Sequence, residues 1–263
     1  MKTFSDVRSE IKELFKSAPL ISPLTWQGKD VSKSMFMQTY ELLNHSSTLI
    51  LAGTDLGHYR ETIGPDLPWA DEHFEERVSG YPLNPGTQWA NWREGEGARK
   101  FLLADGTFNH SYSERIWPKF ARKVPSSKVP EPDLLMGLSP RRGILYDYGD
   151  LNDLVTLLKR DPLTRQAFLP MFFPEDTGAV HGGRAPCSLG WHFIRRDEKL
   201  HCVYYLRSCD VFNHWRNDMY MAVRLLLWVL EKTGWIDIKP GTLTTHITSL
   251  HCFRGQYEEY LNT

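Results

Sequence analysis

A long apolar run late in the chain, "MYMAVRLLLWVL" over 219–230, most constrains how this sequence can fold. The run is apolar on all sides of a helix, and it predicts a helix over 217–232 that lies inside a core. It is too short to span a bilayer, and it contains Arg224. We therefore expect a domain built around one buried helix, and no membrane as partner.

The stretch that leads into this helix, "RSCDVFNHWRND" over 207–218, is polar although it follows the apolar run "LHCVYYL". A solvated loop explains the polarity but not a position between two elements that should be buried. Buried charges need partners. The alternative is the floor of a binding site, in which arginine binds phosphate and aspartate pairs with a heterocycle.

Composition narrows the class of protein further. The 263 residues are 41% hydrophobic and 24% charged, which is typical of a globular chain long enough for a large core. A net charge of -1 gives no reason to expect nucleic acid as partner. The four cysteines form no CxxC pair, which fits a reducing cytoplasm.

Local patterns predict an α+β fold with a mostly antiparallel sheet packed against the long buried helix. The segment "SLGWHFIRRDEKLHCVYYLRS" predicts two strands joined by a charged turn. Further helices are expected at about 4–16, 31–45, 94–104 and 150–162, with a short strand at "STLILAG".

Cys187, in "GGRAPCSLGW", is a candidate nucleophile at the start of a predicted strand. A nearby cation such as Arg184 makes a thiol more nucleophilic. The alternative is a small buried apolar residue. Histidines and cysteines are frequent in the C-terminal half, but none has zinc-finger spacing and HExxH is absent, so no metal site is predicted.

The segment "APCSLGWHFIRRDEKLHCVYYLRSCDVF" resembles the core of the thymidylate synthase family, and the resemblance extends over about residues 60–260. It implies a thymidylate-synthase-like catalytic domain at 56–263, with residues 1–55 as an N-terminal helical extension. It also implies a homodimer whose substrates are a nucleotide monophosphate and 5,10-methylenetetrahydrofolate.

The resemblance assigns roles through short motifs that include "GYPL", "RIW", "DYG", "DPLTRQ" and "SLHCF". The catalytic residues that it implies are Cys187, Asp218, Tyr148 and Glu96. The residues that it implies for nucleotide binding are Arg60, Arg165, Arg207, Ser208, Asp218 and His251. The residues that it implies for the folate are Asp210 and Trp117.

Besides Asp218 and Ser188, three positions depart from the family pattern. Gln166 replaces the second arginine of the pair that reaches the partner subunit's phosphate. Phe253 replaces a tyrosine that holds the sugar. The family's spacing places the catalytic glutamate at Gly97, so that Glu96 is the neighbouring carboxylate.

Asp218 determines the expected substrate. Thymidylate synthases have an asparagine there, whereas "WRND" resembles the "FRND" of phage-type deoxycytidylate hydroxymethylases, and Ser188 is similar to their threonine. A protonated carboxyl group can donate to N3 of cytosine and accept from N4. The resemblance thus implies 5-hydroxymethylation of dCMP, for a modified DNA base, in the cytoplasm of a host if the gene is a phage's.

Several alternatives remain open at this stage. They are a dCMP methyltransferase, a CMP hydroxymethylase, a thymidylate synthase that acts on dUMP, and an inactive homologue that only binds nucleotide. Asp218 has its own alternative, which is to cap the helix that follows it.

Overall fold

The structure, a computed structural model, describes residues 2–88, 101–119, 149–177 and 184–263. The chain forms two compact units. Unit 1 comprises Met1–Pro65, Leu163–Gln166 and Cys187–Thr263, and unit 2 comprises Asp66–Pro162 and Ala167–Pro186. Unit 1 is discontinuous in sequence, and its first segment ends at Pro65. The division at residue 55 remains a prediction.

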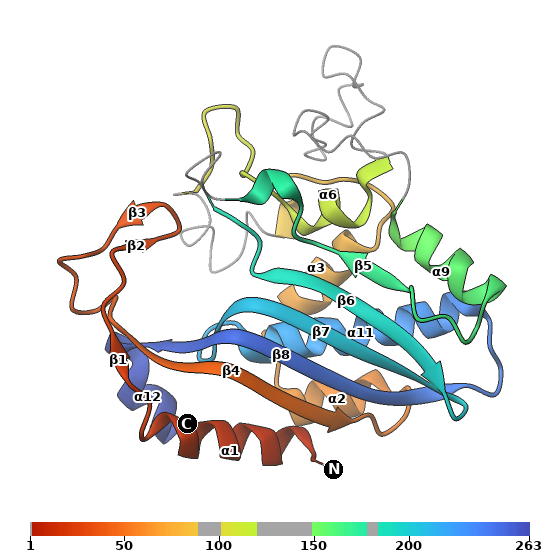
Figure 1. Cartoon of the computed structure of the whole chain (residues 1–263), viewed down its shortest axis with the longest axis horizontal. Helices are drawn as coiled ribbons and strands as arrows, with labels where there is room; N and C mark the ends of the chain where they lie inside the picture. Colours follow the sequence, from red (N-terminus) through yellow and green to blue (C-terminus); the bar gives the residue numbers. More distant parts are fainter. Residues whose placement is uncertain (1, 89–100, 120–148, 178–183) are drawn as a thin grey trace. The chain divides into compact units, whose positions relative to one another are not determined.

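Unit 1 is built on a sheet in which the strands follow the order β1-β4-β8-β7-β6 (Figure 1). Only β7 and β8 are parallel among these five, and the other neighbours are antiparallel. The predicted α+β class with a mostly antiparallel sheet is therefore confirmed. The sheet strands are β1 (Leu20–Ile21), β4 (Thr39–Ile50), β6 (Ser188–Arg196), β7 (Lys199–Asp210) and β8 (Lys239–Phe253). The other elements are α1 (Phe4–Phe15), the pair β2 (Thr25–Trp26) and β3 (Lys29–Asp30), α2 (Leu56–Ile63), α11 (Trp215–Thr233), η4 (Arg254–Gln256) and α12 (Tyr257–Asn262).

The hairpin of β6 and β7 has the two strands and the charged turn that the sequence predicts. Asp197 and Glu198 take left-handed φ values of 47° and 56° at the turn, as tight hairpin connections require. The strands keep one register from Arg196 opposite Lys199 to Gly190 opposite Tyr205, and an irregularity between Gly190 and Ser188 shifts it so that Ser188 lies opposite Leu206. This hairpin brings residues 187 and 207 to the same end of the sheet.

Helix α11 forms the core of unit 1, and its prediction from the apolar run is confirmed. Met219, Ala222 and Leu226 are fully buried, and the helix packs on β7, β8 and α2. Gly234 ends it with a left-handed φ of 72°, a conformation that glycine adopts without steric cost. The helix begins at Trp215, two residues before the predicted start at 217.

The N-terminal segment contains one confirmed helix and one error. α1 is present, and Thr3 and Asp6 form a capping box at its start. The predicted helix at 31–45 is wrong, because residues from Thr39 onward form β4. β4 pairs with β8 from Thr39 opposite Phe253 to Ile50 opposite Thr242, so pairing with a distant strand overrides the local pattern.

Unit 2 consists mainly of helices. Its described elements are α3 (Trp69–Arg77), α6 (Tyr112–Ile116), α9 (Leu151–Arg160), β5 (Phe168–Pro170) and η3 (Pro174–Asp176). α9 confirms the helix predicted at 150–162. The predicted helix at 94–104 lies mostly outside the described residues. Arg115 and Asp176 form a buried ion pair, with 2.6 Å between Nη2 and Oδ1.

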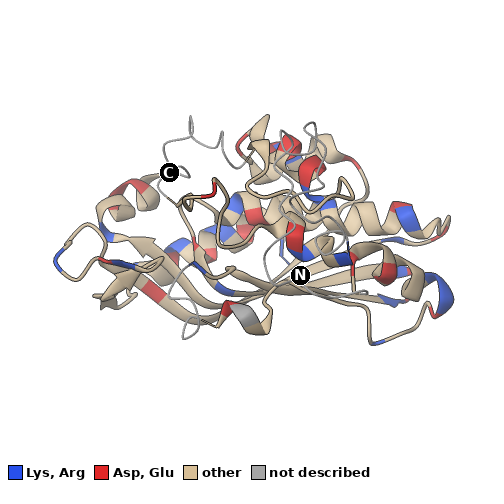
Figure 2. Ribbon diagram, turned by 90° about the horizontal axis from the view of Figure 1, so that it is seen from above, with Lys and Arg blue, Asp and Glu red and all other residues tan. Residues whose placement is uncertain are grey.

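Charged residues of both signs are distributed over the helices and strands (Figure 2). Within the described parts of the chain, no helix combines the length and apolar character needed to cross a bilayer.

Candidate active site

The C-terminal end of β7 and the neighbouring part of β8 bring three predicted binding residues together. In the parallel register Asp210 lies opposite His251, and Ser208 lies opposite Ser249. The Ser208 hydroxyl is 3.5 Å from Nδ1 of His251. Burial lowers the pKa of His251, which keeps the ring neutral at pH 7. Ser208 and His251 therefore form one polar cluster of neutral donors and acceptors.

Cys187 lies directly before β6, next to Arg207 of β7. Its carbonyl accepts a hydrogen bond of 2.9 Å from the Arg207 amide, and its Sγ is 3.9 Å from Nη2 of Arg207. A cation at this position stabilises a thiolate. The next residue, Ser188, is buried and bonds the Tyr204 hydroxyl at 2.5 Å, which fixes the backbone that carries the thiol.

The other three cysteines are poor candidates for a nucleophile. Cys202, Cys209 and Cys252 are buried, whereas Cys187 is half-buried. Burial raises the pKa of the Cys202 and Cys209 thiols, and it raises the pKa of Cys252 to about 12. The thiolate is the reactive form, so these three thiols are almost wholly unreactive at neutral pH. Burial and charge therefore favour Cys187.

Asp218 lies in the first turn of α11, and it does not cap the helix. The N-cap residue is His214, and the Asp218 amide already donates an intrahelical bond of 2.9 Å to the His214 carbonyl. The capping alternative is therefore wrong. The Asp218 side chain is half-buried, and Oδ2 lies 3.7 Å from the Sγ of Cys209. The first turn of a helix favours a negative charge.

Asp210 holds the turn between β7 and α11. Oδ1 accepts hydrogen bonds of 3.0 Å from the amides of Phe212 and Asn213, and Oδ2 accepts one of 2.7 Å from Nδ2 of Asn213. Asn213 also bonds Gln256 beyond β8. The carboxylate is thus committed largely to the turn, and it has limited remaining capacity for a ligand.

Two predicted phosphate-binding arginines lie at other places in unit 1. Arg60 is on α2, and its Nε donates a bond of 3.2 Å to the hydroxyl of Tyr220 in α11. Arg165 has an exposed side chain, and its carbonyl is bonded by Nε2 of His192 at 3.0 Å. The structure therefore joins Arg207 to Cys187 directly, and it places Arg60 beside α11.

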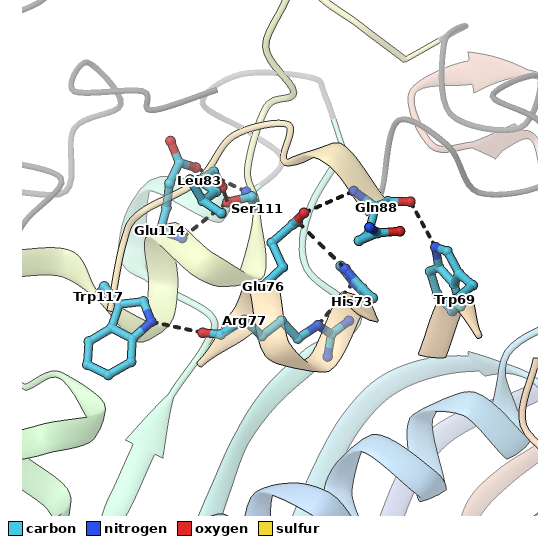
Figure 3. A network of polar contacts seen from close by, with 9 residues as sticks. All are labelled: Trp69, His73, Glu76, Arg77, Leu83, Gln88, Ser111, Glu114 and Trp117. Carbon is cyan, nitrogen blue, oxygen red and sulfur yellow. Dashed lines mark hydrogen bonds and ion pairs between the residues drawn. The ribbon is translucent and has the colours of Figure 1, made fainter. Parts of the chain in front are cut away.

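Trp117 belongs to a buried polar network in unit 2 (Figure 3). Its side chain is 2% exposed, and its indole N–H donates a bond of 2.8 Å to the carbonyl of Arg77. Arg77 in turn donates through Nε to Nε2 of His73 at 3.1 Å. So small an exposed area leaves the indole ring little surface for folate, and the ring instead links α6 to α3.

Glu76 is at the centre of the same network. One carboxylate oxygen accepts from the Gln88 amide at 2.9 Å, and the other lies 3.8 Å from Nδ1 of His73. Burial lowers the pKa of His73 to about 4, so this contact involves a neutral imidazole and is no ion pair at pH 7. Glycine is favoured at position 86 because its φ is left-handed at 75°, and a Cβ there would also displace Oε1 of Glu76, which it would meet at 1.9 Å.

Two predicted catalytic residues, Tyr148 and Glu96, lie outside the described residues. Sequence reasoning missed Cys209, whose neighbours include Cys187 and Asp218. It also missed two carboxylates, Glu114, which is buried, and Glu76, whose side chain is 8% exposed. The sequence did offer a signal for Cys209, because it lies between two predicted site residues, Ser208 and Asp210. The described residues contain no group of three or more histidine, cysteine, aspartate or glutamate side chains that could hold a metal ion.

Differences in burial predict that Cys187 is the reactive thiol of the native protein. An aromatic disulfide reagent should quickly modify about one thiol per native chain, because only accessible thiolate reacts. Cys187→Ser should remove the fast phase, and Cys202→Ala, which also removes a thiol from the hairpin, should keep it. A fast phase that persists in Cys187→Ser would contradict this assignment.

Comparisons with known proteins identify the family of this chain. The family model described as thymidylate synthase matches residues 81–263. A protein of Methanosarcina barkeri named "Putative thymidylate synthase" is 30% identical over 176 residues, which are 65% of this chain and 66% of that protein. A Methanosarcina mazei protein of the same name is 31% identical over 105 residues, 40% of this chain and 46% of that protein.

A thymidylate synthase of Rhodopseudomonas palustris is 26% identical over 117 residues, covering 44% of this chain and 35% of its own length. The chain thus spans between about a third and two thirds of these relatives. The family match covers most of the chain, including the strands and the helix that carry Cys187, Arg207 and Asp218. The chain belongs to the thymidylate synthase family.

Proposed function

We propose that this protein transfers a one-carbon unit from 5,10-methylenetetrahydrofolate to C5 of dCMP, with water, to give 5-hydroxymethyl-dCMP and tetrahydrofolate. The family membership supports one-carbon transfer to a nucleotide. The observation that carries the choice of dCMP is the carboxyl group of Asp218 in the first turn of α11, two residues after Arg216 in "WRND".

Cytosine and uracil present opposite hydrogen-bonding groups at positions 3 and 4. Cytosine has an acceptor at N3 and an amino donor at N4, so a protonated carboxyl group satisfies both. An amide in the geometry suited to uracil would set donor against donor on cytosine, at a cost of about 1–3 kcal/mol. Asp218 therefore favours cytosine, and an asparagine there would favour uracil.

Cys187 starts the proposed reaction. Its thiolate adds to C6 of the pyrimidine, with Arg207 beside the sulfur to stabilise the anion. Negative charge then develops toward N3, where Asp218 supplies a proton. C5 becomes nucleophilic and takes up the one-carbon unit that the folate supplies.

The remaining steps release the product. C5 loses its proton, tetrahydrofolate leaves, and water adds to the exocyclic methylene group, after which the Cys187 thiolate is expelled. We assign the proton steps to Tyr148 and Glu96, by resemblance to the family. Addition of water rather than hydride follows the resemblance of the "WRND" segment and Ser188 to hydroxymethylases.

The proposed binding roles follow the polar cluster. Arg207 and Ser208 bind the phosphate together with Arg60 of the same chain and Arg165 contributed by the second subunit of a dimer, and His251 holds a sugar hydroxyl. The Asp210 carboxylate is held in place by the hydrogen bonds that it accepts within the turn. Its remaining acceptor lone pair can accept a hydrogen bond from an N–H group of the folate's pterin. Trp117 is assigned to the folate by resemblance to the family, and its indole is held by the hydrogen bond to the Arg77 carbonyl.

We further propose a homodimer in which Arg165 reaches the phosphate in the partner's site, as in the family. The Arg165 side chain is exposed on its own chain, so it is accessible to a second subunit. One face of β7 supports association, because side chains on it such as Val203 and Tyr205 are only half-buried, whereas the residues that alternate with them are buried on the opposite face.

The substrate proposal predicts that Asp218→Asn changes the preference between bases. kcat/KM for dCMP should fall more than about tenfold, because both base pairing and protonation of N3 are lost. kcat/KM for dUMP should rise relative to that for dCMP. Chromatography of the nucleotide products should show 5-hydroxymethyl-dCMP from the wild type.

Asp197→Asn provides the matched control, because it makes the same chemical change at an exposed hairpin turn where asparagine tolerates the positive φ. It should leave both values of kcat/KM unchanged. A ratio of dCMP to dUMP turnover that stays the same in Asp218→Asn would contradict the base-reading role, and 5-methyl-dCMP as product would replace hydroxymethylation by methylation.

The dimer proposal predicts complementation between two inactive or weakened variants. Cys187→Ser should lack turnover while it still binds nucleotide, and Arg165→Ala should bind the phosphate more weakly. Mixed after subunit exchange, the two should regain part of the activity, because one site of each hybrid has both residues. An active protein that sediments as a monomer would contradict shared sites.

A further inference from the structure

We propose that Cys209 is a positioning residue, whose thiol orients the carboxyl group of Asp218 for base recognition; this role rests on the proposed function. Cys209 lies on β7, and Asp218 lies nine positions further along the chain on α11. The turn that Asp210 holds brings the two side chains together.

The contact between the two side chains is part-buried, and the thiol that makes it is buried. Cys209 is 3% exposed, and its Sγ lies 3.7 Å from Oδ2 of Asp218 and 3.8 Å from the carbonyl oxygen of Asp210. A thiol has one proton to donate, and a carboxylate is a stronger acceptor than a peptide carbonyl. The S–H group therefore donates to Asp218 when that residue is ionised.

The thiol of Cys209 keeps its proton at neutral pH. Burial raises its pKa well above the usual value, and the negative charges of Asp218, Asp210 and the Cys187 thiolate raise it further. Cys209 is therefore a permanent donor. The Cys209 thiol is close to Cys187 and Asp218, and it remains uncharged there.

A donor on Oδ2 distinguishes the two oxygens of Asp218. Oδ2 serves as an acceptor, so the proton of the carboxylic acid is favoured on Oδ1. In that form Oδ1 donates to N3 of cytosine, while Oδ2 uses its second lone pair to accept from the N4 amino group. Without the thiol, this preference for a proton on Oδ1 is lost.

Cys209→Ala tests this role by removing the donor. kcat/KM for dCMP should fall by about three- to tenfold, in line with the loss of one weak hydrogen bond, and that for dUMP should change less. Cys209→Ser keeps a donor and should restore most of the preference for dCMP. Cys202→Ala removes an equally buried thiol from the same strand and should not change the ratio.

Infrared spectroscopy tests the contact without any assay of activity. The S–H stretching band of Cys209, identified as the band that Cys209→Ala removes, should move to higher frequency in Asp218→Ala because its acceptor is lost. An unmoved band overturns the inference, as does an unchanged ratio of dCMP to dUMP turnover in Cys209→Ala. If Asp218→Asn shifts that ratio in the same experiment, the proposed function stands although the role of Cys209 fails.

A wild type that uses dUMP in preference to dCMP overturns the proposed function itself, and with it the recognition role of Cys209.

Discussion

The candidate site depends on the hydrogen bonds that the Asp210 carboxylate accepts from the turn between β7 and α11. These bonds come from the amides of Phe212 and Asn213 and from the Asn213 side chain. The Val211 amide adds a bond of 2.8 Å to the His251 carbonyl, so the turn is also tied to β8. These bonds fix the position of the first turn of α11 relative to the last residues of β7.

Cys187 and Cys209 differ in their burial and in the charges around their thiols. Cys187 is half-buried beside the Arg207 guanidinium, while Cys209 is buried among negative charges that raise its pKa. The same residue, cysteine, thus serves as a candidate nucleophile at one position and as a neutral hydrogen-bond donor at another. Burial and the sign of the neighbouring charge decide between the two roles.

The sequence predicted the elements whose signals are local. The α11 helix and the β6–β7 hairpin follow from an apolar run and a charged turn, and both are present. The predicted helix at 31–45 was wrong because β4 is determined by pairing with β8, far away in the sequence. Pairing of the two hairpin strands brings Cys187 next to Arg207, a contact that the sequence analysis did not predict.

The contact between Cys209 and Asp218 could not be predicted, because it depends on the geometry of the turn and on a helix start two residues earlier than the pattern indicates. The capping alternative for Asp218 failed for the same reason.

The central claim is that the protein transfers a one-carbon unit to C5 of dCMP rather than of dUMP, and that C5 loses its proton in this reaction. The most direct measurement is release of tritium into water from 5-tritiated dCMP and from 5-tritiated dUMP, each incubated with the protein and 5,10-methylenetetrahydrofolate. The account predicts folate-dependent release from dCMP that is much faster than release from dUMP. Faster release from dUMP, or no release from either nucleotide, would contradict it.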